Sequence, residues 1–377
     1  MQLADYRECC GCGNCQVVCP QNAIKVDYDM RGFLHPMVDE ERCISCGACE
    51  KKCPIINDLS KLKTGFAIKG YYGRFYQDEV VRHCSSGGIA SGLASTFLRR
   101  GNAVVYGSEY SADFEMVLTN RIDSVDDVYR FQGSKYIQSV KGDIYKNIKQ
   151  DLSLGNEVLY IGLPCDIAAL KLYLNKEYTK LYCVDLICHG PTSKSFLSEY
   201  LRNVSHGEKV KSFSMRHKKD GIWTPYYMHI LLENGEVIEE PFWTSDFGAL
   251  FARFCCDGCM TCKFKGSNRF SDITIGDAWG VDANLVADNK SGLSSIIINT
   301  QKGTELINQN DFLLIDANVD SIIKGNPNIT EKRNQHIDYP IVVKNVYSKG
   351  IKNTVKMVRS KKNVIRTMFS KVIKRGG

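Results

Sequence analysis

The sequence has 377 residues, of which 44% are hydrophobic and 24% charged, a composition that excludes a mainly disordered, collagenous or coiled-coil chain. The length predicts about two to three domains at roughly 150 residues each. The net charge of +7 belongs to residues 344–377, which hold eleven Lys or Arg and no acidic residue, while the remainder holds 38 basic and 42 acidic residues. We therefore expect no nucleic-acid partner.

The sequence shows neither an export signal nor a membrane-spanning segment. No run of 18 apolar residues occurs, so we expect no membrane-spanning helix. The N-terminus, MQLADYRECC, lacks a basic stretch followed by an apolar core. The sequence thus predicts a cytoplasmic protein.

Cysteine is the outlier of the composition, with 17 residues. The cytosol keeps thiols reduced and the number is odd, so a disulfide framework is not expected. The cysteines therefore predict metal binding or thiol chemistry.

Two cysteine runs near the N-terminus share one spacing. Residues 9–20 read CCGCGNCQVVCP and residues 43–54 read CISCGACEKKCP, each containing C-x2-C-x2-C-x3-C-P. This spacing is the signature of bacterial two-cluster ferredoxins, in which the fourth cysteine of each run ligates the other cluster. We expect two [4Fe-4S] clusters, one held by Cys9, Cys12, Cys15 and Cys53, the other by Cys43, Cys46, Cys49 and Cys19. Two zinc sites are the alternative, and Cys10 is surplus.

The elements expected next complete this domain and begin another. Alternating residues at 23–27 and 32–36 predict short strands, which gives an α+β ferredoxin-like two-cluster domain over residues 1–60. Residues 55–70 carry no strong pattern and read as a linker.

The body is expected to be α/β with a partly parallel sheet, in two regions of residues 61–205 and 206–340. Apolar runs predict strands at 103–107, 158–162, 182–187, 227–232, 272–276 and 295–299, and helices at 89–100 and 167–174. Strand, helix and strand in succession indicate a parallel unit. Neither G-x-G-x-x-G after a strand nor a P-loop is found, which weakens a simple nicotinamide-dependent dehydrogenase without excluding flavin.

Three body segments carry candidate chemistry at the ends of these elements. One segment, before the first predicted helix, consists of Ser85, Ser86, Gly87 and Gly88. Hydroxyls and glycine amides at the start of a helix can bind an anion. The same residues are also typical of an ordinary helix N-cap. Cys165 begins the next helix, as a cluster ligand, a redox thiol or a small buried residue. Cys188 and His189 end the following strand at the same carboxyl edge, where ligands bind. We therefore regard Cys165, Cys188 and His189 as candidate catalytic residues.

A third cysteine hook lies at residues 255–262, CCDGCMTC. Cys256, Cys259 and Cys262 repeat C-x2-C-x2-C without the fourth cysteine, so we expect a third cluster completed by Cys84, Cys165 or Cys188. Cys255 could replace Cys256, and zinc is the alternative. Residues 217–223 (HKKDGIW) read either as a loop for an anionic or ring-bearing ligand or as a solvated turn.

The order of these motifs is that of a known family. SSGG at 85–88, GSKYIQS at 133–139, GLPCD at 162–166, CHG at 188–190 and CKFKGSNRFSDITIGDAWG at 262–280 follow one another. The chain resembles the coenzyme F420 hydrogenase/dehydrogenase beta-subunit family, over residues 1–340, with a ferredoxin domain in front. It departs from the family pattern in GLPCD, where G-T-P-C-Q is usual, and in CHGPTS, where C-H-G-V-P-S is usual.

This resemblance implies an iron–sulfur flavoprotein that binds FAD and a further [4Fe-4S] cluster. It implies flavin contacts near Ser85, Ser86, Gly87, Gly88, Ser134, Lys135 and Tyr136, and cluster or flavin-proximal roles for Cys165, Cys188, Cys259 and Cys262. The sequence looks closer to the bacterial polysaccharide-associated branch, which implies a small-molecule or lipid-linked substrate in polysaccharide biosynthesis. Coenzyme F420 itself is a weaker expectation.

The expected function is an oxidoreductase. Electrons would pass from an external donor, such as ferredoxin or a reduced deazaflavin, through the clusters to FAD and then to the substrate. The alternatives are an electron-transfer subunit without its own flavin, docked to a separate enzyme, and a zinc-stabilised binding protein.

The C-terminal segment, residues 341–377, is basic. Ile351, Val355, Val358, Ile365, Phe369 and Val372 recur at steps of three or four, with Lys362 interrupting. This pattern over 349–375 predicts a basic amphipathic helix that contacts the inner membrane face, or packs on the body or an acidic partner.

Overall fold

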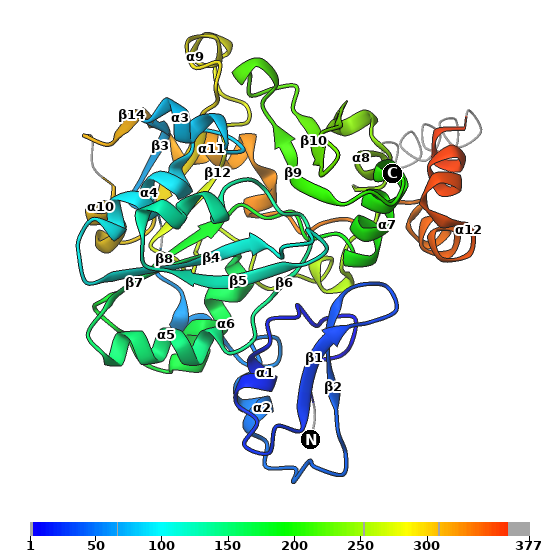
Figure 1. The fold of residues 1–377 in the computed structure, drawn as a ribbon. Helices are drawn as coiled ribbons and strands as arrows, with labels where there is room; N and C mark the ends of the chain where they lie inside the picture. Colours follow the sequence, from blue (N-terminus) through cyan, green and yellow to red (C-terminus); the bar gives the residue numbers. More distant parts are fainter. Residues whose placement is uncertain (1–2, 66, 252, 308–309, 361–377) are drawn as a thin grey trace, which may run out of the picture.

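The computed structural model describes residues 3–65, 67–251, 253–307 and 310–360. An N-terminal domain projects from the lower side of the molecule (Figure 1). Its elements are α1 (Asn14–Val17), β1 (Ile24–Tyr28), β2 (Leu34–Val38) and α2 (Ala48–Lys51). The two strands are antiparallel, and each short helix begins after a left-handed glycine. The predicted α+β two-cluster domain is confirmed, including its two short strands.

A large mixed sheet forms the centre of the body. In spatial order its strands are β14 (Phe312–Ala317), β3 (Lys69–Phe75), β13 (Ser294–Ile298), β12 (Ile273–Asp277), β8 (Leu181–Leu186), β7 (Glu157–Gly162), β4 (Ala103–Tyr110), β5 (Val117–Ile122) and β6 (Ser139–Val140). Four neighbouring strands, β12, β8, β7 and β4, run parallel, and β13, β3 and β14 continue the sheet antiparallel. The predicted α/β body with a partly parallel sheet is confirmed.

Helices cover both faces of this sheet because its central strands are apolar on both sides. On β4, Val104 and Tyr106 point to one face and Val105 to the other, as the pleat requires. The helices of the body before residue 206 are α3 (Asp78–Arg82), α4 (Ile89–Leu98), α5 (Ile144–Ser153), α6 (Pro164–Leu174) and α7 (Lys194–Ser205). Helices α5 and α6 pack on the first face, and α4 packs on the second.

A second, smaller sheet stands beside the first. Its strands, in the order β11 (Val237–Pro241), β10 (Tyr227–Leu232) and β9 (Val210–His217), are antiparallel. The remaining helices are α8 (Asp246–Phe251), α9 (Ala283–Asp288), α10 (Gln301–Leu306), α11 (Val319–Gly325) and α12 (Tyr339–Arg359).

The C-terminal helix α12 packs on the body, as one of the alternatives for the basic tail predicts. Ile351, Val355 and Val358, which the sequence places on the apolar face, are buried in one hydrophobic cluster with residues of α7 and α8. This apolar stripe is therefore already covered. Lys362, Ile365, Phe369 and Val372 lie outside the described residues. Within the described part of the chain, no helix is both long and apolar enough to cross a membrane.

The N-terminal domain is anchored to the body by polar contacts. The side-chain amide of Asn14 donates to Ala169 O of α6 at 3.0 Å. The guanidinium of Arg31 pairs with Asp257 at 2.8 Å. These contacts fix the cysteines of the domain relative to those of the body.

Candidate functional site

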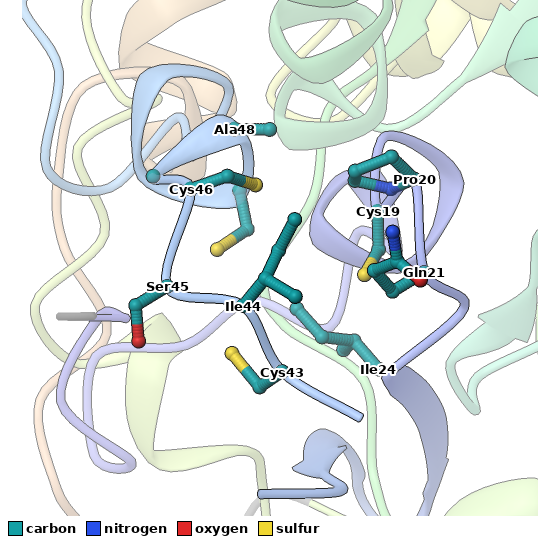
Figure 2. A pocket seen from close by; sticks show the side chains of 11 residues that line it. Cys19, Pro20, Gln21, Ile24, Cys43, Ile44, Ser45, Cys46 and Ala48 are labelled. Atoms are coloured by element: carbon teal, nitrogen blue, oxygen red, sulfur yellow. The ribbon is translucent and has the colours of Figure 1, made fainter. Parts of the chain in front are cut away.

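The outermost cysteine group lies at the end of the N-terminal domain. Cys19, Cys43, Cys46 and Cys49 line one cavity, whose empty space is about 300 Å³, together with Ile24 and Ile44 (Figure 2). Gly47, at φ 72, turns the chain between Cys46 and α2, a conformation that favours glycine. Cys46 is exposed and Cys49 is buried. The group combines three cysteines of the second run with the fourth of the first run.

A second group lies between the first and the body. Cys9, Cys12, Cys15 and Cys53 line another cavity, with about 400 Å³ of empty space. Burial, together with the neighbouring thiols Cys12, Cys256 and Cys53, raises the pKa of Cys9 to about 12. Thiols in such a place ionise when a metal centre supplies positive charge. We call these two sets the outer and the inner group.

The pairing of the cysteines favours clusters over zinc. In the outer and the inner group, three cysteines of one run line a cavity with the fourth cysteine of the other run, which is the ligand pairing of two-cluster ferredoxins. Structural zinc sites usually join two C-x2-C pairs that are separated by a longer spacer.

A third group gathers in the body, at the carboxyl edge of the parallel strands. Cys165 lies in the first turn of α6, after β7, and Cys188 follows β8. Burial raises the pKa of Cys188 to about 12, and Cys165 and Cys262 contribute to it. The thiol of Cys259 interacts with Cys188 in the same way. These four cysteines form what we call the body group.

Glycine and backbone amides shape the body group. The amide of Gly190 donates to Cys188 Sγ at 3.2 Å. A side chain at Gly190 would clash, because a Cβ there would lie 2.9 Å from Cys259 Cβ. The CHG motif thus brings Cys188 and Cys259 together by leaving out a side chain.

Cys256 lies on the side of the body group that faces the inner group. Its Sγ lies 3.7 Å from Cys9 O and 3.8 Å from Gln138 Nε2, and its thiol interacts with Cys259. Cys256 therefore borders the body group, and its role as a cluster ligand stays a prediction.

Cys84 lies away from these groups. It is buried, with its Sγ 3.2 Å from Val80 O and 3.2 Å from Ser91 Oγ. Of the three cysteines considered as the missing ligand, the structure brings Cys165 and Cys188 to the site and leaves Cys84 elsewhere.

Cys10 connects the inner group and the body group. Its thiol interacts with the thiols of both Cys12 and Cys165. The carbonyl of Cys10 accepts from Gln138 Nε2 at 3.1 Å, which fixes the turn. The cysteine that is surplus to the ferredoxin signature therefore lies where the two groups approach each other.

A buried ion pair lies beside this junction. Lys141 Nζ is 2.9 Å from Asp166 Oδ1, and both side chains are 5% exposed. Burial alone would lower the pKa of Lys141, but Asp166 and then Cys165 leave it raised, so this lysine is charged at neutral pH. From the sequence, Asp166 stands out only as the last residue of GLPCD, where the family pattern has glutamine. Lys141 carried no signal because its partner lies 25 residues away in sequence.

The SSGG segment is a packed turn before α4. Ser85 Oγ accepts from the amide of Ser134 at 2.7 Å, and Gly87 donates its amide to Ser294 Oγ at 3.0 Å. Gly88 is left-handed, with φ 76. The structure thus joins two of the segments predicted to contact flavin, and it engages the Gly87 amide within the protein.

The other predicted flavin contacts differ in their surroundings. Lys135 Nζ donates to the carbonyls of Phe131, Gln132 and Gly133 at 3.3, 2.8 and 3.1 Å. Its amine is therefore held by its own loop, and burial lowers the pKa of Lys135 to about 7. The ring of Tyr136 instead joins an aromatic cluster, 4.6 Å from Phe251.

His189 lies in this aromatic cluster beside a cation. Its ring is 4.6 Å from Phe251, and Arg333 donates to His189 O at 3.1 Å. Burial, with Arg333 adding, lowers the pKa of His189 to about 4. The imidazole is therefore neutral at pH 7, and its Nδ1 lies 3.2 Å from Arg333 Nη1. Arg333 was not identified from the sequence, because it lies outside the motifs.

Arg216 is a buried arginine of the body that the sequence analysis did not identify. Its side chain is 4% exposed and pairs with Asp277 at 2.5 Å. Nε and Nη2 are buried without a hydrogen-bond partner in the described structure. Its guanidinium lies 4.3 Å from the centre of the Tyr226 ring. Buried donors without a partner suit an anionic ligand, because they are costly to leave unpaired.

Comparisons with known proteins match both parts of this architecture. Residues 8–55 match the model of a 4Fe-4S dicluster domain. Residues 155–315 match the model of the C-terminal region of the coenzyme F420 hydrogenase/dehydrogenase beta subunit. Residues 155–315 are thus similar to that family. The chain combines this similarity with a segment that is similar to two-cluster iron–sulfur domains.

Two curated relatives extend the similarity to most of the chain. The coenzyme F420-dependent sulfite reductase of Methanocaldococcus jannaschii is 24% identical over 318 residues, covering 81% of this chain and 46% of the relative. This chain therefore spans less than half of that protein. A subunit of the F(420)H(2) dehydrogenase of Methanosarcina mazei is 24% identical over 323 residues, covering 80% of this chain and 82% of the relative.

A solved structure shares the fold. A chain of the F420-reducing [NiFe] hydrogenase complex from Methanosarcina barkeri aligns with a TM-score of 0.51 and 19% identity, covering 75% of this chain and 94% of that chain. These findings confirm the resemblance to the beta-subunit family. The polysaccharide-associated branch, FAD and the membrane contact stay predictions.

Proposed function

We propose that the chain is an iron–sulfur flavoprotein oxidoreductase, which moves electrons from an external low-potential donor through three [4Fe-4S] clusters to FAD and an organic substrate. The observation that carries this proposal is the succession of the outer, inner and body groups of four cysteines. When bound, the clusters exchange single electrons and a flavin supplies two-electron chemistry.

The exposure of the cysteines indicates where electrons enter. Cys46 of the outer group is exposed, and Ile44 beside it is 61% exposed. The inner and body groups lie deeper, with Cys10 between them. Because electron tunnelling weakens steeply with distance, the donor docks at the outer group and the chain orders the transfers inward.

The body offers residues that suit the flavin. Arg216 has two buried donors without a partner, which fit the pyrophosphate of FAD. Ser85 and Ser134, joined at 2.8 Å between their hydroxyls, hold the two predicted flavin segments together. Tyr136 and His189 add an aromatic wall, with ring centres 5.6 Å apart. We propose that His189 positions the substrate, and that Cys165 and Cys188 are cluster ligands rather than catalytic thiols.

Composition of the protein purified without oxygen tests this proposal. We expect about twelve iron and twelve sulfide per chain, with one FAD released by acid. Arg216→Met should lose flavin and keep iron, whereas Arg99→Met, which removes a half-exposed surface cation, should keep both. Protein without flavin after reconstitution, or flavin binding unchanged in R216M, would contradict the flavin assignment.

A second candidate is an electron-transfer protein that docks to a separate enzyme and has no flavin of its own. The names of two relatives favour it, since one is part of a dehydrogenase and the other a chain of a hydrogenase complex. Turnover by the isolated chain distinguishes the two functions. Reduction of a substrate panel with reduced viologen, or with reduced F420 followed near 420 nm, supports the enzyme, and cluster reduction without turnover supports the electron-transfer protein.

A further inference from the structure

The small sheet carries a group of metal-type side chains that the electron-transfer function does not use. His217 ends β9, His229 lies on β10 and Glu239 lies on β11. One ligand atom from each lies within 4.8 Å of the other two. Within the described residues, this is the one group of three His, Cys, Asp or Glu side chains with such spacing.

Strand register places the three side chains on one face. His229 is directly opposite Glu239 in the β10–β11 pair. The β9–β10 pair sets Tyr227 opposite His217 and has an irregularity between Tyr227 and His229. Residues two apart on a strand share a face, so the irregularity brings the ring of His217 to 4.4 Å from that of His229.

The donors themselves are suited to a metal ion. Nε2 of His217 is 3.7 Å from Oε2 of Glu239. Two imidazoles and one carboxylate suit zinc or a similar first-row ion, whereas calcium and magnesium prefer oxygen alone.

We propose that His217, His229 and Glu239 bind one divalent transition-metal ion, for which Zn²⁺ is the expected ligand, with a fourth position open to a small molecule. All three side chains are partly buried, so solvent reaches the site. A site with three protein ligands and an open position is the arrangement that catalytic zinc sites use.

The site adjoins the segment proposed to hold flavin. Lys218, next to His217, donates through Nζ to Val81 O at 2.7 Å and to Ser86 O at 2.6 Å. These bonds tie the end of β9 to the SSGG segment.

One cation competes with the metal. Lys219 Nζ is 2.5 Å from Oε1 of Glu239, the other oxygen of the carboxylate. Removing this lysine frees the carboxylate and removes a positive charge next to the ion. Because like charges repel, Lys219→Met should tighten metal binding severalfold. A damaged fold could not produce such a gain.

Zinc titration of the holoprotein, with its iron–sulfur clusters intact, tests the proposal. Competition with a chromophoric chelator should show one Zn²⁺ per chain, while the cluster absorbance stays constant. His229→Gln and Glu239→Gln should weaken that site at least tenfold, and K219M should tighten it. The control is His206→Asn, because His206 is an exposed histidine in a left-handed turn that asparagine tolerates.

The outcomes separate cleanly. Equal zinc binding in H229Q, E239Q and H206N would overturn the proposal, and so would K219M that binds no tighter than the unmodified protein. Retention of iron in H229Q would show that the clusters, and with them the proposed electron-transfer function, are independent of this site.

Discussion

The Lys141–Asp166 pair is expected to be a strong determinant of stability where the inner group meets the body. Its atoms are 2.9 Å apart with both side chains 5% exposed. At an effective dielectric constant of about 20, two unit charges at that distance attract by about 6 kcal/mol. Lys141 also donates to Ser139 O at 3.0 Å and Ser139 Oγ at 2.9 Å. Lys141→Met therefore leaves a buried carboxylate without its cation, and we expect a loss of about 3–5 kcal/mol.

A double-mutant cycle isolates the pair. Asp166→Leu alone should destabilise the protein, whereas K141M combined with D166L should cost less than the sum of the single changes by about 2–3 kcal/mol. The control is Lys146→Met, because Lys146 lies 2.8 Å from Asp143 with the two side chains 49% and 64% exposed. That surface pair should change stability by about 0.5 kcal/mol or less.

The assay is urea unfolding without oxygen, followed by tryptophan fluorescence. Trp223 and Trp279 stack at 5.1 Å in the body and report its unfolding. The free-energy difference comes from the shift of the midpoint at constant slope. The pair does not stabilise this junction as described if K141M and K146M lower the free energy of unfolding equally. The same conclusion follows if the loss in the double variant equals the sum of the two single losses.

Three further predictions follow from the same contacts. Cys10→Ala should keep all iron but slow reduction of the body group in stopped-flow experiments, and unchanged kinetics would show that Cys10 is no bridge. Cys84→Ser should retain the full iron content, while Cys188→Ser should lose about four iron atoms. The reverse result would make Cys84, and not Cys188, a ligand of the body cluster. His35 is buried against Tyr6, and burial lowers the pKa of its imidazole below 6.5. The unfolded chain therefore binds a proton at His35 that the folded chain does not, so the free energy of unfolding should fall as the pH drops below about 6.5. In urea titrations at several pH values, His35→Phe should reduce the dependence of that free energy on pH. An equal pH dependence in the variant and the unmodified protein would contradict this assignment.

The cysteine runs and the short strands were predictable because each depends on residues that are close together in the sequence. Cysteines spaced three apart wrap one site, so the sequence predicts the contents of the outer and inner groups. The fourth members, Cys19 and Cys53, follow from the ferredoxin signature. The strands at 158–162 and 182–187 were predictable because each is a short, continuous apolar run.

The remaining features depend on contacts between distant residues. The sequence predicts the apolar face of the C-terminal helix, but not that Ile351 and Val355 are covered by α7 and α8. The body group needs β7 and β8 to end side by side before Cys165 and Cys188 can meet.

The metal-type group of the small sheet was also not predictable from the sequence. His217 and Glu239 are 22 residues apart and meet only through the register of three strands. Residues 217–223 were read from the sequence as a ligand loop or a solvated turn. In the structure, Lys218 ties this segment to Val81 and Ser86.

Mössbauer spectroscopy of protein grown on ⁵⁷Fe and isolated without oxygen tests the central claim most directly. The account predicts that about twelve iron atoms per chain all belong to four-iron clusters. About eight such atoms would mean that the chain has no body cluster. Iron in other forms, or zinc in its place, would contradict the assignment of the three cysteine groups.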